Sequence, residues 1–530
     1  MTVDDRERAP AQGATGYLRN QLEAVLLTPV RAMRWSYLPL LMVYFAYGAL
    51  GIIGIAQSFW VKSALTLTPA ELAALGVWLT LPWTIKMVFG ELVDSVPILG
   101  SQRRAYVFIG AGLTAAGLLL LAGAASGTIT FVSHDAIYVA ASLLSVTGVV
   151  LQDVVADAMS TEVVPRVEAD GTPRSMADIN RDLGMVQVLG RLALSIGIFA
   201  VAGLAGYLAE ALSYATVFLI GLVVPLISIS GALLVRLETS ERRPIDWRIL
   251  GGGLVFGCVV TALGFAQVPL GQEIVFAVST AVIVVMLGRV TREISAAARR
   301  HIFFAAMIIF LFRATPTVGE GYRWFTIDVL GFNESFYGVL GQTGAALGLA
   351  GAWLLSDAIT RQPVARVLLW LTIVGAVLAV PTIMLVSGMY EWTDRLFGIG
   401  ARSIAVIDAA ASSPLAQISM IPLLTLIAVY APSGHRATWF ALMASLMNLA
   451  LVAGELQTKY LNLIFHVDRG HYEQLLPLAL VATAIGVCMP LAAILGFGSR
   501  ISGDPPDGAV ECGTGGTGAA RPAQGERASP

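Results

Sequence analysis

Apolar segments of about 20 residues or more recur along most of the chain, and short polar turns separate them. A segment of this length crosses a bilayer as a helix, so the pattern predicts an all-α integral membrane protein rather than a soluble core or a barrel. About fourteen spans are predicted, near residues 37–61, 69–93, 104–125, 136–163, 185–208, 212–235, 249–269, 272–290, 301–328, 336–356, 364–387, 402–430, 437–464 and 474–498.

The first six and the last six of these spans resemble each other. Residues 59–76 and 325–341 each end an odd span, cross a short polar loop and start the next helix. Such internal similarity is typical of transporters with duplicated halves. The predicted organisation is a tail at 1–36, a six-helix bundle at 37–236, a linker with two inserted transmembrane helices at 237–300, a second six-helix bundle at 301–498 and a disordered tail at 499–530.

The composition agrees with a membrane protein and excludes several other classes. Of 530 residues, 56% are hydrophobic and 13% are charged, and the net charge of -2 provides no basic field for nucleic acid. The cysteines lack disulfide or metal-ligand spacing, and the sequence contains no Walker loop or nucleophile elbow. We therefore expect no enzyme, no catalytic residue, no cofactor and no metal site.

The distribution of arginine predicts the orientation, because short cytoplasmic loops of membrane proteins retain lysine and arginine. One side collects most of these residues, including Arg31, Arg34, Arg103, Arg104, Arg166, Arg174, Arg242, Arg243, Arg289, Arg292, Arg299, Arg300, Arg361 and Arg366. The opposite side holds few of them. We expect a multi-pass protein of a bacterial inner membrane with both termini cytoplasmic.

Residues 86–104, KMVFGELVDSVPILGSQRR, join the second and third spans through a polar turn. Small glycines let helices approach, an aspartate can face a helix N-terminus, and arginines hold a turn on the cytoplasmic side. The segment is therefore a predicted conformational latch. Its residues are Gly90, Asp94, Arg103 and Arg104. Asp357 occupies the matching place in the second half.

The order glycine, acid, glycine, basic pair in residues 86–104 resembles the loop between helices two and three of the major facilitator superfamily. The SVPILG insertion after Asp94 is similar to the folate-biopterin transporter family. Four more segments agree with that family, at residues 67–86, 152–159 (QDVVADAM), 310–332 (FLFRATPTVGEGYRWFTIDVLGF) and 431–450. The resemblance implies the major facilitator fold, here with an inserted helix pair, and secondary active transport of a folate- or pterin-like anion.

Charged side chains inside the spans are functional candidates, because each costs about 2.5 to 3.5 kcal/mol at the bilayer centre. Asp153 and Asp157 lie roughly 18 Å and 12 Å from one end of their helix and share a face, so their repulsion favours proton uptake and release. We predict that they couple transport to protons. Lys86 and Arg191 are predicted to bind the carboxylates of the solute. The alternative is a static ion pair between these cations and the aspartates.

In the second half, Arg313 lies roughly 18 Å into its span and is predicted to contact the anion. Pro316 and Gly319 follow it and weaken the helix, as in the discontinuous helices of transporters. Asn448 and Glu455 are seven residues apart on nearly one helix face and are further predicted substrate contacts.

Glu320 and Arg323 are predicted to pair near the outer end of the ninth span, as a gate or as a structural clasp. Together with Glu162 they depart from the family pattern. These departures motivate an alternative, a transporter of the same fold for another organic anion, a sugar or an exported compound. A second alternative is a non-transporting assembly or delivery factor for a membrane complex.

These features predict a monomeric, proton-coupled secondary transporter whose partners are a small-molecule solute, protons and the lipid bilayer.

Overall fold

The structure is a computed structural model that describes residues 33–501, except residues 99, 102, 169–171, 235–244, 246, 266–267, 293–294, 361 and 431–435. Within these residues every regular element is a helix, and extended pairing is limited to isolated β-bridges. The predicted all-α class is therefore confirmed. Of the two predicted tails, residues 1–32 and 502–530 lie outside the described residues.

The first half of the chain contains six spans. Its elements are η2 (Trp35–Tyr37), α3 (Leu38–Ala49), η3 (Leu50–Ile53), α4 (Gly54–Ala64), α5 (Pro69–Thr84), α6 (Lys86–Ser95), α7 (Arg104–Ala125), α8 (His134–Glu162), α9 (Met176–Ala211), α10 (Tyr214–Ile220) and α11 (Val223–Leu234). Thr68 and Glu71 form a capping box that starts α5. Pro82 weakens the helix that they start, because it lacks a backbone donor, and α5 ends at Thr84 with Lys86 opening α6.

The second half follows an inserted pair, α12 (Trp247–Phe265) and α13 (Gly271–Val290). Its elements are α14 (Ala296–Arg313), α15 (Glu320–Asp328), α16 (Glu334–Thr360), α17 (Val364–Leu378), α18 (Val380–Val386), α19 (Met389–Phe397), α20 (Ala401–Ile418), α21 (Met420–Val429), α22 (Arg436–Phe465) and α23 (Leu475–Ile501). Because α23 continues to Ile501, the helix ends three residues later than predicted.

Twelve helical segments of the described residues are long and apolar enough to cross a membrane. The two remaining predicted spans are α16, with 27 residues, and the pair α14–α15, which is interrupted at residues 314–319. Pro316 cannot donate a backbone hydrogen bond, and Gly319 adopts a φ of 79°. The predicted weakness of the helix after Arg313 is therefore confirmed as a complete interruption.

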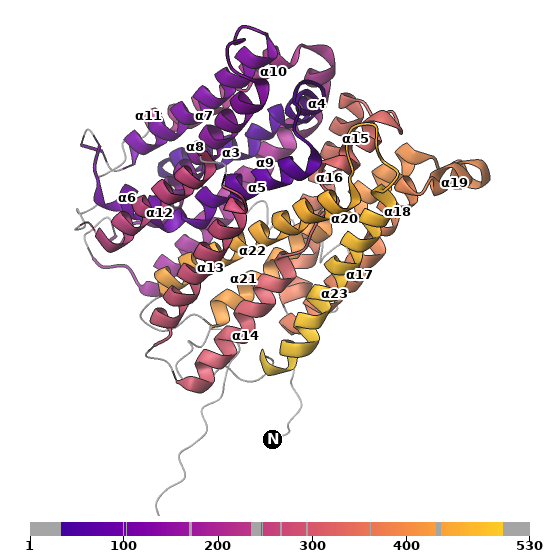
Figure 1. Ribbon diagram of the computed structural model, residues 1–530. Coiled ribbons are helices and arrows are strands. Elements are labelled where there is room, and N and C mark those ends of the chain that lie inside the picture. Colours follow the sequence, from indigo (N-terminus) through magenta and orange to yellow (C-terminus); the bar gives the residue numbers. More distant parts are fainter. Residues whose placement is uncertain are drawn as a thin grey trace, which may run out of the picture.

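The two halves meet along two helix pairs, α5 against α22 and α9 against α16 (Figure 1). The second pair is in close contact, because a Cβ atom on Gly206 would lie 2.6 Å from the Cα atom of Gly338. The inserted helices lie on one side of this arrangement, α12 beside α6 and α13 beside α22 (Figure 1). We call the face at which α3 begins and α23 ends the inner face, and the opposite one the outer face.

Candidate functional site

A charged cluster lies inside the first half, where α6 faces α8. Lys86 opens α6, and its ammonium nitrogen lies 2.5 Å from Asp153 Oδ2 and 2.6 Å from Asp157 Oδ2. Tyr44 of α3 donates a hydrogen bond of 2.7 Å to the other oxygen of Asp157. The structure thus brings three predicted residues together. Two carboxylates therefore share one ammonium group.

Arg191 of α9 lies beside this cluster without joining an ion pair. The neighbouring Gly190 packs on Tyr44, since a Cβ atom there would lie 2.8 Å from Cε2 of the tyrosine ring. Arg191 is exposed, and within the described part of the chain it makes no hydrogen bond or ion pair. The static ion pair considered from the sequence is therefore seen for Lys86, whereas Arg191 acts on the aspartates only as a nearby charge, without direct contact among the described residues.

A cavity of about 390 Å³ adjoins the cluster, walled by α3, η3, α4, α5, α7 and α8. Tyr47 and Trp83 line it with their rings stacked at 5.9 Å, and the amide of Gln57 faces the same space. Tyr47 also lines a smaller hollow together with Asp153. Sequence reasoning missed this aromatic pair, because the stacking depends on how two spans are rotated against each other.

Arg313 ends α14 directly before the interruption. Its Nε atom donates a hydrogen bond of 3.3 Å to the carbonyl oxygen of Met447, and its Nη1 atom lies 2.7 Å from the sulfur of Met420. A thioether is a weak acceptor, and no carboxylate of a described residue pairs with this guanidinium. Arg313 therefore remains an uncompensated cation in the second half.

Helix α22 supports the interrupted segment. Gln457 donates a hydrogen bond of 2.6 Å to the carbonyl oxygen of Ala314, and the amide of Thr317 donates one of 3.0 Å to the hydroxyl of Thr458. Backbone groups freed inside a membrane need such partners. The interruption is thus held in place by side chains of a neighbouring helix.

Asn448 and Glu455 lie where α22 faces α5. The Asn448 amide donates a hydrogen bond of 3.1 Å to the carbonyl oxygen of Trp83. Glu455 packs on Gly76, where a Cβ atom would lie 3.0 Å from its carboxylate. Both residues therefore sit at the contact between the halves. The Glu455 carboxylate makes no hydrogen bond or ion pair with the described residues.

The predicted latch at residues 86–104 forms an ion-pair chain. Arg103 Nη2 lies 2.8 Å from Asp94 Oδ1 and 2.5 Å from Glu162 Oε1, and Arg103 is 5% exposed. Burial alone would lower the pKa of Arg103, but the hydrogen bonds and charges of Glu162 and Asp94 raise it above its usual value. Arg104 donates a hydrogen bond of 2.9 Å to the carbonyl oxygen of Ala232 near the end of α11. All these partners belong to the first half.

Two other latch residues behave differently from the expectation. No described atom lies within 4 Å of a Cβ atom built on Gly90, so the expected close helix approach does not occur there. The reason is that α6 contacts its neighbours through side chains on its other faces. Asp357 lies in α16, and its side chain is outside the described part of the structure.

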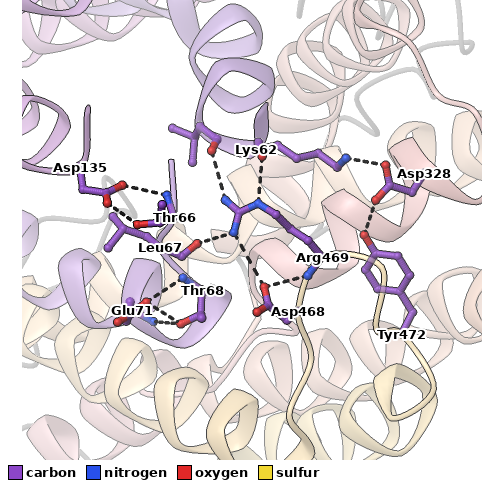
Figure 2. A network of polar contacts seen from close by, with 11 residues as sticks. Lys62, Thr66, Leu67, Thr68, Glu71, Asp135, Asp328, Asp468, Arg469 and Tyr472 are labelled. Atoms are coloured by element: carbon purple, nitrogen blue, oxygen red, sulfur yellow. Dashed lines mark hydrogen bonds and ion pairs between the residues drawn. The ribbon is translucent and has the colours of Figure 1, made fainter. Parts of the chain in front are cut away.

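The outer face carries a polar network between the halves that the sequence did not indicate (Figure 2). Lys62 at the end of α4 forms an ion pair with Asp328 at the end of α15. Tyr472, in the loop between α22 and α23, donates a hydrogen bond of 2.5 Å to the same carboxylate. The available signal was the scarcity of basic residues on this face, which makes each of them a candidate.

Arg469 in the same loop binds the end of α4 (Figure 2). Its guanidinium donates hydrogen bonds to the carbonyl oxygens of Val61, Lys62 and Leu67, at 3.3 Å, 2.9 Å and 2.8 Å. It also lies 3.9 Å from the ring centroid of the buried Trp324. We call Lys62, Asp328, Arg469 and Tyr472 the outer closure.

Glu320 and Arg323 lie near the outer closure. They are 3.8 Å apart, as the predicted local pair requires. Arg323 also reaches the first half, where its Nη1 atom donates a hydrogen bond of 2.5 Å to the hydroxyl of Ser58. This pair therefore takes part in contact between the halves.

Comparison with known proteins decides the family. The chain matches the BT1 family over residues 48–504. The chain belongs to the BT1 family. Similar curated BT1-like proteins include the folate-biopterin transporter of a Synechocystis species, 28% identical over 488 residues, covering 91% of this chain and 85% of that protein. The putative folate transporter 2 of Plasmodium berghei is 21% identical over 447 residues, covering 84% of each.

Solved structures show the fold of this BT1 protein. A POT family transporter in complex with a thioalcohol-conjugated peptide has a TM-score of 0.59 at 12% identity, covering 88% of this chain and 96% of that one. A D-xylose–proton symporter has a TM-score of 0.53 at 14% identity, covering 86% and 95%. The expected folate-biopterin transporter resemblance and the major facilitator fold are confirmed. The protein is a multi-pass membrane transporter of a small solute, not an enzyme.

Proposed function

We propose that this BT1 protein is a secondary active transporter that moves a folate- or pterin-like organic anion by alternating access, coupled to protons. The observation that carries the proposal is Arg313, an uncompensated guanidinium placed directly at a helix interruption. A carboxylate is the group that such a cation binds best. The curated relatives named for folate and biopterin support the same solute class.

The cavity of the first half suits the other end of such a solute. A pterin is a flat heteroaromatic ring, and the stacked pair of Tyr47 and Trp83 offers it an aromatic face. Gln57 lines the same cavity, and its amide, whose nitrogen donates a hydrogen bond of 3.4 Å to the hydroxyl of Tyr138, is a polar group on that wall. Arg191 belongs to the same half and is exposed, and it forms no ion pair with the described residues. A solute with a ring and a carboxylate would thus contact both halves.

The charged cluster supports coupling to protons. Two close carboxylates share the single ammonium group of Lys86, and their mutual repulsion favours proton uptake by one of them. Protonation of one aspartate would weaken its bond to Lys86 and release α6 from α8. Glu455, whose carboxylate has no described partner at the contact between the halves, is a second candidate proton carrier.

The outer closure supports alternating access. Its hydrogen bonds and ion pairs join α4 of the first half to α15 and the loop 466–474 of the second. Contacts of this kind would hold the outer ends of the two halves together and keep the outer route closed. Transport then requires them to break while the halves rock about the contacts α5–α22 and α9–α16. We further propose a monomer in a bacterial inner membrane, with the inner face cytoplasmic.

Uptake by the purified protein in liposomes tests this proposal. We expect labelled folate or biopterin to accumulate when the outside is acidic, and accumulation to collapse when a protonophore removes the gradient. A labelled sugar serves as the control solute. If the correctly inserted protein moves neither folate nor biopterin, the substrate assignment is refuted. If uptake occurs equally with and without the gradient, proton coupling is refuted and the solute class stands.

A further inference from the structure

A second cavity lies between the inserted helix pair and the two halves, and its lining residues differ from those of the cavity beside the charged cluster. Its volume is about 490 Å³, and its walls come from α12, α13, the junction of α5 and α6, and α22. Most of the lining is apolar, including Val88, Phe256, Val282, Met286 and Leu442. The cavity therefore offers a large hydrophobic surface at membrane depth.

Two arginines line the same cavity at one end. Arg248 is in the first turn of α12, and Arg289 is in the last turn of α13. The two helices are antiparallel, so both guanidinium groups lie at the inner face. Both residues are exposed. A pair of guanidiniums above an apolar wall is complementary to an amphiphile with an anionic head and a hydrocarbon tail.

A buried serine belongs to the wall of this cavity. Ser279 of α13 is 5% exposed and lines the cavity, and its hydroxyl has no hydrogen-bond partner among the described residues. A buried hydroxyl is ordinarily paired. This oxygen lies below the accessible surface of the wall, so the recognition groups of the cavity are its two arginines and its apolar side chains.

The inserted helices α12 and α13 are held against the two halves by direct contacts on both sides of the cavity. Lys459 of α22 lies 2.7 Å from Glu273 Oε1, and Tyr460 donates a hydrogen bond of 2.7 Å to the same oxygen at the outer end of α13. On the other side, a Cβ atom on Gly253 would lie 2.3 Å from Val88 Cγ1, so α12 packs closely on α6. The cavity is thus a built space whose walls belong to both halves.

We propose that this cavity binds one anionic phospholipid, with its phosphate between Arg248 and Arg289 and an acyl chain along the apolar wall. The bilayer supplies such a molecule at the depth and on the face where the arginines lie. Because α6 belongs to the first half and α22 to the second, the bound lipid contacts both. This site is independent of the proposed solute.

Lipid binding to the purified full chain tests the proposal. Native mass spectrometry would count bound phosphatidylglycerol, with phosphatidylcholine as the neutral lipid and inorganic phosphate as the headgroup alone. We expect one phosphatidylglycerol to remain bound and to raise the thermal midpoint, while the other two probes have little effect. Equal retention of both lipids would refute the site, because it would reveal only annular lipid. Stabilisation by inorganic phosphate alone would refute the acyl-chain part.

Matched variants separate the head and tail contacts. The double substitution Arg248→Gln with Arg289→Gln should weaken phosphatidylglycerol binding by about thirtyfold, whereas Arg292→Gln, which removes a charge outside the cavity, should not. Gly252→Leu should abolish binding by filling the cavity, since nothing lies within 4 Å of its Cβ position. Gly257→Leu is the control, because its Cβ position is equally open on the same helix and does not line the cavity. Wild-type binding by the double variant or by Gly252→Leu would overturn the proposal.

Discussion

The charged centres of the two halves differ in how their charges are balanced. In the first half, Lys86 is held by Asp153 and Asp157 within 2.6 Å. In the second half, Arg313 contacts a carbonyl oxygen and a thioether, and no described carboxylate approaches it. Both centres lie inside the membrane, where an unbalanced charge is expensive.

This difference indicates a division of labour. The ion pairs of a compensated cluster hold their helices together until protonation of a carboxylate weakens them. Such a cluster is therefore suited to coupling helix movement to proton binding. An uncompensated arginine gains its partner only when an anion arrives, so it suits binding. The transporter proposed above would need both properties, and the two centres belong to opposite halves. The outer closure then joins the two halves at a distance from both centres.

Removing the uncompensated cation should have the largest effect. We expect Arg313→Gln to lower folate or biopterin uptake by about a hundredfold, because a charge-assisted contact of about 3 kcal/mol is lost. Stability should be retained, since no described carboxylate is left unpaired. The exposed Arg395→Gln provides the control, because that residue is 79% exposed on α19. Unchanged uptake by Arg313→Gln would refute the role of Arg313 in anion binding and with it the proposed difference in function between the two charged centres.

The compensated cluster should respond in the opposite way. Lys86→Met leaves two carboxylates without their cation, so the free energy of unfolding in mixed micelles should fall by about 3 kcal/mol. Adding Asp153→Asn should restore more than half of that loss, because one negative charge disappears. The measurement is the unfolding midpoint of the single and double variants. A single variant as stable as the wild type would show that the cluster is solvated rather than compensated.

The outer closure should govern the balance between access states. Arg469→Gln removes up to three hydrogen bonds to the end of α4, which together contribute about 2 kcal/mol. The population open at the outer face should then rise by about thirtyfold. Distances between spin labels on the outer ends of α4 and α15 would report it. Arg469→Lys should rescue the closure only in part, because lysine lacks the planar fork. An unchanged distance distribution would show that Arg469 is not part of the gate.

The smallest effect is expected for Tyr472→Phe. The substitution removes one hydrogen bond to Asp328, which contributes about 1 kcal/mol. The population open at the outer face, measured from the same spin-label distances, should therefore rise by about fivefold. Burial, and then the bond to Asp328, raise the pKa of Tyr472 above its usual value. Its contribution is therefore complete below about pH 10 and is lost as the pH rises further. The difference from the wild type should be constant between about pH 6 and pH 9, and a steady decline over this range would contradict the assignment.

Much of the fold follows from the sequence because its signals are local. The length of each apolar segment predicts a span, and Pro316 with Gly319 predicts the interruption after Arg313. The spacing of Asp153 and Asp157 places them on one helix face. Their partner was open, since either Lys86 or Arg191 was suitable. The structure selects Lys86, because α6 begins opposite α8 at the right depth.

Other parts of the site depend on distances between helices. The ring pair of Tyr47 and Trp83 requires a particular rotation of two spans. Arg469 donates hydrogen bonds to backbone carbonyl oxygens. Because every residue has such an oxygen, these partners cannot be predicted from the residue types in the sequence. Gly90 lacks the close helix neighbour that its residue type suggested. Each of these outcomes depends on the packing of segments far apart along the chain.

By itself, the sequence determined that the protein spans the membrane and that it carries charged residues within its apolar segments, and it predicted two similar halves with an inserted helix pair. These are consequences of hydrophobic length and of the energy of burying a charge, which each segment expresses alone. Only the tertiary structure decided which charges are compensated, where the halves are joined and what the inserted pair encloses. Those properties depend on distances of a few ångströms between different helices, and no single segment contains them.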